Sequence, residues 1–468
     1  MTLLCQQQEA LLQFHFIQMR AAVAGLTART FTRRYHPSVP STSSVVARMS
    51  RSDAAATTTS GDDDVADESA TTSIRVETPR WRPLRGMRAE ELRLKYTLPT
   101  GQSFRWRPRG CREDDYVGVI GGRVVRVREG EDADADAEYK VYCRPSGEGE
   151  NEDEARVREY FNADVSLADL YAGFRERDER FRALSTHVPG ARMLSQDPGE
   201  CLFSFICSSN NHISRIHGMV ERMCVRYGDK LPVTADDLVV DDVDEKKSFA
   251  SEDESPMEFY TFPSATRILR KATEEELRAL GFGYRAKFIV GSAETLAENP
   301  LGKSPDEYLA SLRDEAPYVE AHAALMALPG VGPKVSACVC LFSLKKHQAI
   351  PVDTHVWQFA TEHYMPELRD AKSVTPRVMR AVELKMEDVF GPYAGWAHNA
   401  LFIAELKSVR DALPDELKTP RRPTPSKKKR KQSESSVGEP SQIQIKDEDE
   451  DEKDANPFGS PKPTNPSN

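Results

Sequence analysis

Three features are missing from the sequence, and the first two absences each exclude a class of protein. None of the eight cysteines forms a Cys-x-x-Cys pair, which argues against a zinc or iron–sulfur framework and favours reduced intracellular thiols. No run of about 18 apolar residues occurs, so we expect no membrane-spanning helix and no membrane partner. Basic residues are not in excess either, because the net charge is -10.

The net charge does not exclude a nucleic acid as partner, because the acidic residues are concentrated in a few segments. These are residues 62–68, 236–254 and 447–454, which have the composition of solvated, unfolded chain. Without them the rest of the chain is far less acidic. The total charge therefore says little about the surface that a partner meets.

Residues 1–77 are predicted to be a disordered leader. In residues 1–50, which are rich in Arg, Ser, Thr and Ala, Glu9 is the only acidic residue. This composition is typical of a mitochondrial transit peptide, although an ordinary disordered leader or a misassigned start codon would look the same. Residues 51–77 are rich in Ser, Thr and Asp, which indicates unfolded chain.

Residues 78–192 are predicted to form an N-terminal domain built on an antiparallel sheet, to which helices are added. Short stretches of alternating apolar and polar residues indicate strands with one solvated face. These stretches lie at 92–96, 104–107, 116–120, 124–128 and 139–142. From residue 157 onward the apolar residues recur at helical spacing, which predicts helices.

Residues 193–413 are predicted to form an all-α domain. Helical periodicity is found at 201–227, 273–280, 285–297, 318–328, 334–345, 353–363, 375–390 and 393–411. Residues 236–257 have no such period and are predicted to be a disordered acidic insertion. Residues 414–468 consist of Pro, Lys and acidic runs, which predict a disordered tail, so the fold class is α+β.

A helix-hairpin-helix is predicted at residues 323–345. One helix ends at Leu328, Gly330 and Gly332 permit a tight reversal, and the next helix begins at Pro333, where proline suits the first turn. The free backbone N–H groups at the start of that helix form a natural phosphate site, although a plain interhelical turn would have a similar pattern. The full string Leu-Pro-Gly-Val-Gly-Pro-Lys is more specific, because it matches the hairpin of DNA-binding enzymes.

Lys334 and Asp353 are the candidate catalytic pair. Lys334 lies in the first turn of the second helix, where the positive end of the helix dipole favours the free amine that imine chemistry needs. A simple phosphate contact by Lys334 fits the local sequence equally well. Asp353 is expected to cap the following helix, which would keep its carboxylate charged and rigid beside a sugar that develops positive charge.

The spacing from Gly-Val-Gly-Pro-Lys (330–334) to Pro-Val-Asp-Thr-His (351–355) resembles the helix-hairpin-helix base-excision glycosylases. Other segments are similar to the eukaryotic 8-oxoguanine DNA glycosylases, and the resemblance covers about residues 80–412. The segments are 100–106, 197–211, 280–286 and 391–397. The resemblance implies a twisted antiparallel sheet domain followed by an all-α glycosylase domain. It also implies an enzyme that flips 8-oxoguanine out of duplex DNA, attacks C1′ with the Lys334 amine, and nicks the strand by elimination.

The resemblance assigns further residues to the flipped base and to the DNA around it. The base would lie between Cys338 and Phe402, although core packing is the simpler explanation of these two from the residues alone. The Gly101 carbonyl would accept from N7–H, a donor that 8-oxoguanine has and guanine lacks. The vacated space and the orphan cytosine would be met by Asn210, Arg215, Tyr284 and Arg285. Phosphate contacts would come from His355 and from the backbone of Gly330, Val331 and Gly332.

His398 is the one departure from the family pattern, which commonly has a glutamine beside the Watson–Crick face of the base. Histidine can donate and accept a hydrogen bond, so we expect His398 to be a base contact with a different pH response. No cysteine follows Cys340, which excludes the C-terminal iron–sulfur cluster of related glycosylases. Neither a metal nor another cofactor is expected.

The expected partners are damaged double-stranded DNA and a downstream AP endonuclease, and the protein is expected to be a monomer. The basic cluster at 427–431 resembles a nuclear localisation signal, although a nonspecific DNA-binding tail is an alternative. Together with the leader it predicts nuclear and mitochondrial pools. The alternative function is a monofunctional helix-hairpin-helix glycosylase for alkylated bases, which would use Asp353 without a lysine. A catalytically silent DNA-binding module is the third hypothesis.

Overall fold

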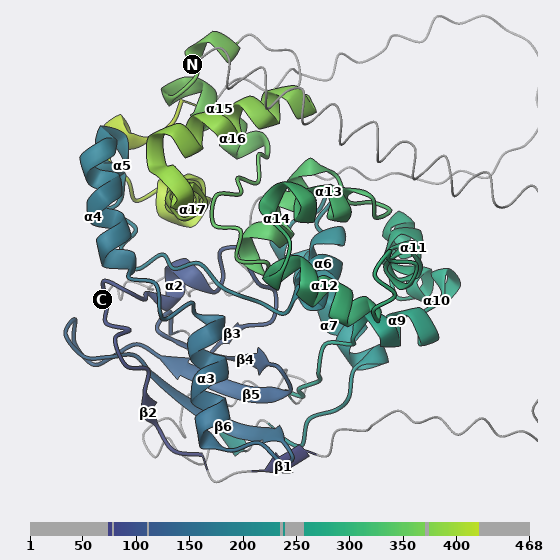
Figure 1. Cartoon of the computed structure of the whole chain (residues 1–468). Helices are drawn as coiled ribbons and strands as arrows, with labels where there is room; N and C mark the ends of the chain where they lie inside the picture. Colours follow the sequence, from purple (N-terminus) through teal and green to yellow (C-terminus); the bar gives the residue numbers. More distant parts are fainter. Residues whose placement is uncertain are drawn as a thin grey trace, which may run out of the picture. The chain divides into compact units, whose positions relative to one another are not determined.

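The structure is a computed structural model that describes residues 74–76, 79–109, 112–234, 237–238, 257–369 and 374–420 (Figure 1). Nearly all of the predicted leader, most of the acidic insertion and the basic cluster at 427–431 lie outside the described residues. Within them, no helix has the length and apolar character needed to cross a bilayer.

One antiparallel sheet of six strands lies in the described part of the chain, in the order β1–β6–β5–β4–β3, with β2 also paired to β6. Its strands are β1 Ile74–Val76, β2 Arg82–Pro83, β3 Arg107–Pro108, β4 Asp115–Ile120, β5 Arg123–Arg128 and β6 Glu138–Pro145. Gly121 and Gly122 both have positive φ in the two-residue turn between β4 and β5, as a tight hairpin requires. Strand β1 lies inside the range predicted to be leader, so the folded chain begins earlier than expected.

Both faces of the sheet are covered, and the predicted solvated face is therefore wrong. One face joins a hydrophobic cluster with Val157 and Tyr160 of helix α3 (Glu150–Tyr160), which lies across the strands in Figure 1. The other face packs against Leu231, Val233 and Phe259, which flank the acidic insertion. The alternation of apolar and polar residues within a strand cannot show that the second face is packed, because the residues that pack on it come from a distant part of the sequence.

Two of the predicted strands are also wrong. Residues 92–96 contain the start of a short helix, α2 (Leu94–Thr97), whose first N–H group donates to a carboxylate oxygen of Glu129 at 2.8 Å. Residues 104–107 contribute only Arg107 to strand β3. A few alternating residues cannot distinguish a strand from one helical turn. Here the turn is helical, and the distant Glu129 carboxylate stabilises it by accepting from its first N–H group.

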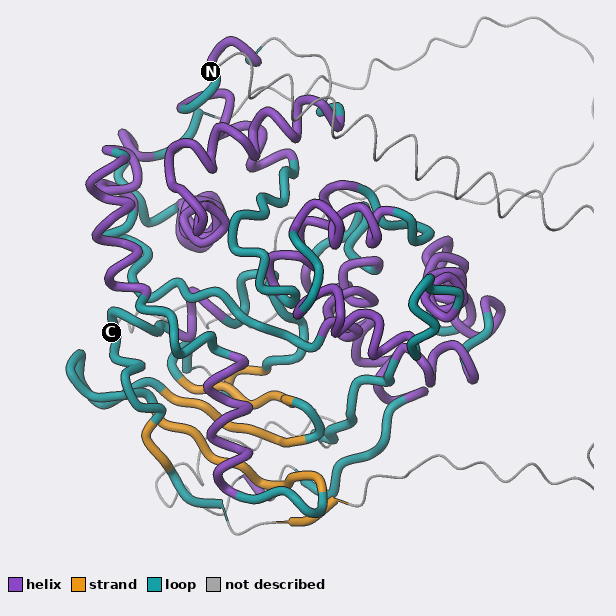
Figure 2. The backbone as a smooth tube through the Cα atoms, in the orientation of Figure 1, coloured by secondary structure: helices purple, strands orange, loops and turns teal. Residues whose placement is uncertain are grey.

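The other elements of the described chain are helices, which are joined by loops, as Figure 2 shows. After α3 come α4 (Leu167–Arg177), α5 (Glu179–Leu184), α6 (Pro198–Ile206), α7 (Ile213–Tyr227), α9 (Ala265–Lys271), α10 (Glu274–Ala279), α11 (Ala286–Ala297), α12 (Pro305–Asp314), α13 (Tyr318–Met326), α14 (Pro333–Phe342), α15 (Thr354–His363), α16 (Pro376–Phe390), α17 (Ala394–Glu405) and α18 (Lys407–Arg410). The periodicity predicted most of these helices but missed α5, α9 and α12. The segment 201–227 is divided into α6 and α7, and the break contains Asn210, a predicted DNA contact.

Candidate active site

Lys334 is the second residue of α14, after Gly332 as the N-cap and Pro333 as the first residue. The lysine is half-buried, and its Nζ lies over the ring of Phe205 at 5.4 Å from the centroid. Phe205, the last residue but one of α6, is held by a stacked contact with Phe342, whose ring centroid is 5.4 Å away. The face of an aromatic ring attracts a cation, so Phe205 restrains the amine. The local sequence contains no signal for this contact.

Asp353 is the N-cap of α15, as predicted. Its Oδ1 accepts from the backbone N–H groups of His355 and Val356, both at 2.9 Å. The carboxylate is half-buried, and its other oxygen, Oδ2, takes part in neither capping bond. The cap therefore fixes the carboxylate while Oδ2 is left to act on a neighbouring group. His355, the predicted phosphate contact, is exposed in the first turn of the same helix.

Cys338 and His398 lie close enough to Lys334 and Asp353 that both charges act on their protonation. Burial raises the pKa of the Cys338 thiol to about 11, the Lys334 ammonium opposes this rise, and the Asp353 carboxylate adds to it. Burial lowers the pKa of His398 to about 4; Asp353 opposes this fall and Lys334 adds to it. The structure thus brings four of the predicted site residues into one electrostatic neighbourhood.

His398 is 4% exposed and stacks on Phe402, with ring centroids 6.2 Å apart and planes at 19°. Neither nitrogen of its ring has a hydrogen-bond partner among the residues that the structure describes. Buried polar groups are nearly always paired, so this ring is suited to a partner that offers one donor and one acceptor. Phe402 also meets the His355 ring edge-on at 6.5 Å. The two predicted base contacts on α17 therefore lie near Lys334 and Asp353, the predicted catalytic pair.

Gly101 has a φ of +90°, a backbone conformation that residues with a side chain rarely adopt. A Cβ atom there would lie 3.3 Å from Cδ1 of Ile213, the first residue of α7. The conformation therefore favours glycine at this position, and a Cβ atom would also press against Ile213. Ile213 is 40% exposed, and it is a neighbour of Gly101 that the sequence did not reveal.

Three of the four residues predicted to face the orphan base lie together. The Tyr284 hydroxyl donates to the Ser209 carbonyl at 2.9 Å, and the Arg285 guanidinium donates to the carbonyls of Ser209 and Asn210, the latter at 3.1 Å. Asn210 has a φ of +49° in the break between α6 and α7. Tyr284 is 43% exposed, whereas Arg285 is buried against this backbone. The fourth residue, Arg215, is exposed on the first turn of α7.

The hairpin between α13 and α14 packs closely against α11. Gly330 has a φ of +77°, and a Cβ atom on it would lie 2.5 Å from Cγ of Phe288. The Ser292 hydroxyl donates to the Pro329 carbonyl at 3.0 Å. Val331 is buried, and Gly332 is exposed at the start of α14. Contacts with α11 therefore hold the hairpin in place, while the start of α14 faces solvent.

The described residues contain no group of three or more His, Cys, Asp and Glu side chains that could hold a metal ion. All six cysteines in this part of the chain are buried and free. What the site offers is an amine, a carboxylate, a thiol, an imidazole and aromatic faces. Such a set can attack a carbon atom, stabilise a developing cation and stack on a planar base.

Two family models match the chain. The model for the N-terminal domain of 8-oxoguanine DNA glycosylase matches residues 86–202, and that for the HhH-GPD superfamily of base-excision DNA repair proteins matches residues 203–384. The sequence is 44% identical to the N-glycosylase/DNA lyase OGG1 of Arabidopsis thaliana, over 72% of this chain and 84% of that protein. It is 33% identical to the N-glycosylase/DNA lyase of Saccharomyces cerevisiae, over 68% of this chain and 84% of that protein.

Solved structures share the fold. MBOgg1 in complex with a low-affinity DNA ligand superposes with a TM-score of 0.55 and 23% identity, over 72% of this chain and 99% of that chain. The Clostridium acetobutylicum 8-oxoguanine glycosylase/lyase, bound to double-stranded DNA with cytosine opposite 8-oxoguanine, has a TM-score of 0.53 and 24% identity, over 71% of this chain and 99% of that chain. The predicted fold, an antiparallel sheet domain followed by an all-α domain, is confirmed.

Proposed function

The chain belongs to the 8-oxoguanine N-glycosylase/DNA lyase family, and on this basis we propose that it excises 8-oxoguanine opposite cytosine from duplex DNA. It is a DNA N-glycosylase with lyase activity that acts in base-excision repair. The observation that carries the proposal for this chain is the shared site of Lys334, Asp353, Cys338 and His398. The Lys334 amine and the Asp353 carboxylate, each at the start of a helix, both act on a buried imidazole whose nitrogens have no hydrogen-bond partner among the described residues.

In the proposed reaction the Lys334 amine attacks C1′ of the flipped nucleotide. The bond from C1′ to the base breaks, its electron pair leaves with the base, and the base takes up the proton that the attacking amine loses. The Asp353 carboxylate stabilises the positive charge that develops on the sugar. Opening of the sugar ring leaves an imine between C1′ and Nζ. Loss of a proton from C2′ then expels the 3′ phosphate and nicks the strand.

The proposed recognition of the base uses the two faces and two edges of its ring. The Cys338 thiol and the Phe402 ring contact the faces, and the Gly101 carbonyl accepts from N7–H. A neutral His398 offers one donor and one acceptor on nitrogens that point away from each other, so one of them can bond O6 or N1–H on the Watson–Crick edge. Because burial lowers the pKa of His398 to about 4, the ring is neutral at physiological pH.

The test is a duplex cleavage assay with 8-oxoguanine opposite each of the four bases, combined with borohydride trapping. We expect wild-type protein to act best opposite cytosine and to form a trapped adduct that Lys334→Gln abolishes. A monofunctional glycosylase for alkylated bases would instead release its base without an adduct and would tolerate Lys334→Gln. Tight binding of the lesion with no base release by the wild-type protein would indicate a silent DNA-binding module.

For the cellular context we propose a monomer that hands its nicked product to an AP endonuclease, in the nucleus and also in mitochondria. The basic cluster at 427–431 and the composition of residues 1–50 support the two locations. A fluorescent fusion to the C-terminus of the full chain should be found in both compartments. Alanine substitution of the cluster should deplete the nuclear pool, and a nuclear pool unaffected by it would count against the proposal.

A further inference from the structure

Residues 190–196 form a segment without regular secondary structure that is buried at every position. We call this segment the strap. It runs between α5 and α6 and is hydrogen-bonded to all three elements that carry the proposed base contacts. These elements are the turn that contains Gly101, helix α14 and helix α17.

The strap holds the Gly101 turn through two buried amide side chains. Gln102 Nε2 donates to the Arg192 carbonyl at 3.0 Å, and Gln102 Oε1 accepts from the Leu194 N–H at 3.1 Å. Gln196 Nε2 donates in turn to the carbonyl of Gln102 at 2.7 Å. Both glutamines are at most 2% exposed. The residue that follows Gly101 is thus bonded through its side chain and its backbone.

The same strap reaches the two helices that complete the base site. The Gln196 N–H donates to the carbonyl of Phe342, the last residue of α14, at 2.8 Å. Asn399, which follows His398 on α17, donates from Nδ2 to the Ala191 carbonyl at 3.4 Å. The strap is therefore hydrogen-bonded to the Gly101 turn, to α14, which carries Lys334, and to α17, which carries His398.

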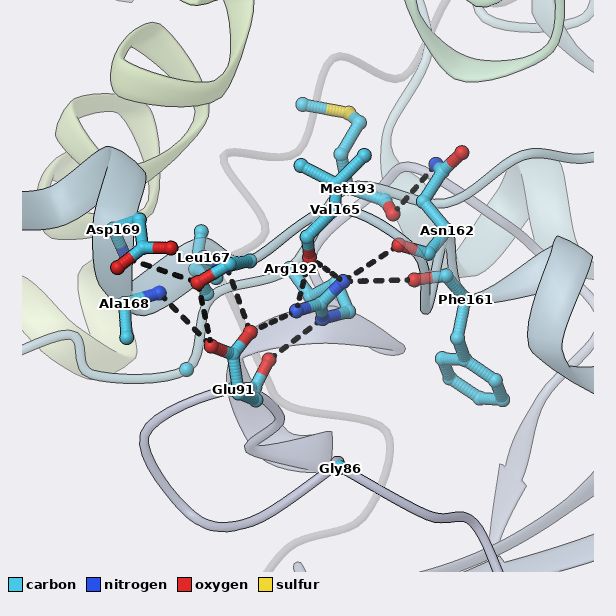
Figure 3. Close-up of polar contacts among 12 residues, drawn as sticks. Gly86, Glu91, Phe161, Asn162, Val165, Leu167, Ala168, Asp169, Arg192 and Met193 are labelled. Carbon is cyan, nitrogen blue, oxygen red and sulfur yellow. Dashed lines mark hydrogen bonds and ion pairs between the residues drawn. The ribbon is translucent and has the colours of Figure 1, made fainter.

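The middle of the strap is anchored by Arg192, as Figure 3 shows. Its guanidinium donates to the carbonyls of Glu91 at 2.7 Å, Asn162 at 2.8 Å and Val165 at 3.0 Å, and it pairs with the Glu91 carboxylate. Asn162 returns a bond to the Met193 carbonyl at 3.0 Å. The strap therefore has little freedom to shift when a base enters.

We propose that Gln102 and Gln196 are positioning residues that fix the Gly101 carbonyl against α14 and α17 and thereby set the selectivity for 8-oxoguanine over guanine. The inference rests on the proposed function, in which a single acceptor distinguishes the two bases. Hydrogen bonds weaken steeply with distance and angle, so a small displacement of that carbonyl costs selectivity. In this role neither glutamine contacts the base itself.

The test uses Gln196→Met and Gln102→Met in the full chain, which replace an amide by an apolar side chain of similar length. Single-turnover excision of 8-oxoguanine should fall on the order of 10- to 100-fold. The ratio of excision at 8-oxoguanine to excision at guanine should fall with it. Cleavage at a preformed abasic site should stay within about twofold of wild type, because that substrate has no base to be read.

Asn299→Leu is the matched control. Asn299 is also a buried amide, and its Nδ2 donates to the carbonyls of Leu296 and Lys303, outside the strap. We expect this variant to lose stability but to keep the selectivity of the wild type. A parallel loss of both activities in the glutamine variants, or an unchanged selectivity ratio, would overturn the positioning role. A wild-type protein that releases no 8-oxoguanine would overturn the proposed function, and this inference with it.

Discussion

The buried imidazole of His398 makes stability depend on pH. Its pKa is about 4 in the folded protein, against an ordinary value of 6.5. Between these values the unfolded chain binds a proton that the folded chain does not, so this contribution to stability is lost as the pH falls from 6.5 to 4. The charged groups that act on the ring are Asp353, which opposes the fall of its pKa, and Lys334, which adds to that fall.

We predict that His398→Gln makes stability less sensitive to acid. Between pH 7.5 and pH 5, the free energy of unfolding should fall by about 1–2 kcal/mol more in wild type than in the variant, since one pKa unit corresponds to about 1.4 kcal/mol. Urea unfolding at the two pH values measures this. His347 and His363, whose pKa values are also lowered to about 4, remain in both proteins and cancel in the comparison. Equal losses in the two proteins would contradict the prediction.

At the level of residues, the sequence indicated groups that belong to a local motif and missed groups that reach the site from elsewhere. The Asp353 cap followed from its place before a helix. The ring of Phe205 beneath Lys334 did not, because the contact joins α6 to α14 and leaves no local pattern. The same holds for Ile213 beside Gly101, and for Gln102 and Gln196, which would pass as ordinary polar residues.

At the level of elements, the two glycines of the hairpin have different reasons for being glycine. Gly330 has a positive φ and no room for a Cβ atom beside Phe288, whereas Gly332 has a φ of -91° and nothing within 4 Å of a Cβ atom. Gly330→Ala should destabilise the fold by about 1–3 kcal/mol and weaken DNA binding, because the hairpin must move. Gly332→Ala should leave the melting temperature nearly unchanged. Equal melting temperatures for the two variants would show that the hairpin is not held as described.

Helix α17 packs closely on the chain that precedes Asp353. A Cβ atom at Gly395 would lie 2.4 Å from Leu341 Cδ1 and 2.7 Å from the carbonyls of His347 and Ala349. We predict that Gly395→Ala costs about 1–3 kcal/mol and displaces α17, which lowers the affinity for 8-oxoguanine duplex in a fluorescence binding assay.

Gly173→Ala on α4 is the control for this prediction, because a Cβ atom there meets nothing within 4 Å. It should stabilise the protein by about 0.5–1 kcal/mol, since alanine is the better helix former, and should leave DNA affinity unchanged. Wild-type affinity in Gly395→Ala would mean that α17 tolerates displacement.

The elements that the sequence predicted best are long and have regular periods. Strands β4 to β6 and most helices from α10 onward followed from spacing alone. The helices that were not predicted are α5, α9, α12 and α2, the last of which is stabilised by Glu129. The cover of the second sheet face was also missed. Each depends on contacts between segments that are far apart in the sequence.

For the whole molecule, the pair of Glu91 and Arg192 joins the N-terminal region to the helices. Glu91 also accepts from the N–H groups of Leu167 at 2.7 Å and Ala168 at 3.1 Å, at the start of α4 (Figure 3). We predict that Glu91→Gln costs about 3–5 kcal/mol of stability, because it leaves the buried guanidinium without its counter-charge.

Glu150→Gln is the control, since Glu150 pairs with Arg80 on the exposed surface. It should cost less than about 1 kcal/mol. Chemical denaturation of the two variants and wild type provides the comparison. A similar loss of unfolding free energy in the two variants would show that the buried pair contributes no more to stability than the exposed pair.

Helix α11 links two parts of the molecule that would meet different parts of the DNA. Tyr284 and Arg285 directly precede this helix, and the ring of its Phe288 lies between Tyr284, at 6.0 Å, and the hairpin glycine Gly330. The residues proposed to contact the orphan base, Tyr284 and Arg285, and the hairpin proposed to contact the DNA backbone therefore pack against the same aromatic side chain, which fixes their separation. If both regions contact the same duplex, the protein therefore sets the spacing of the two contacts and the DNA has to adjust to it.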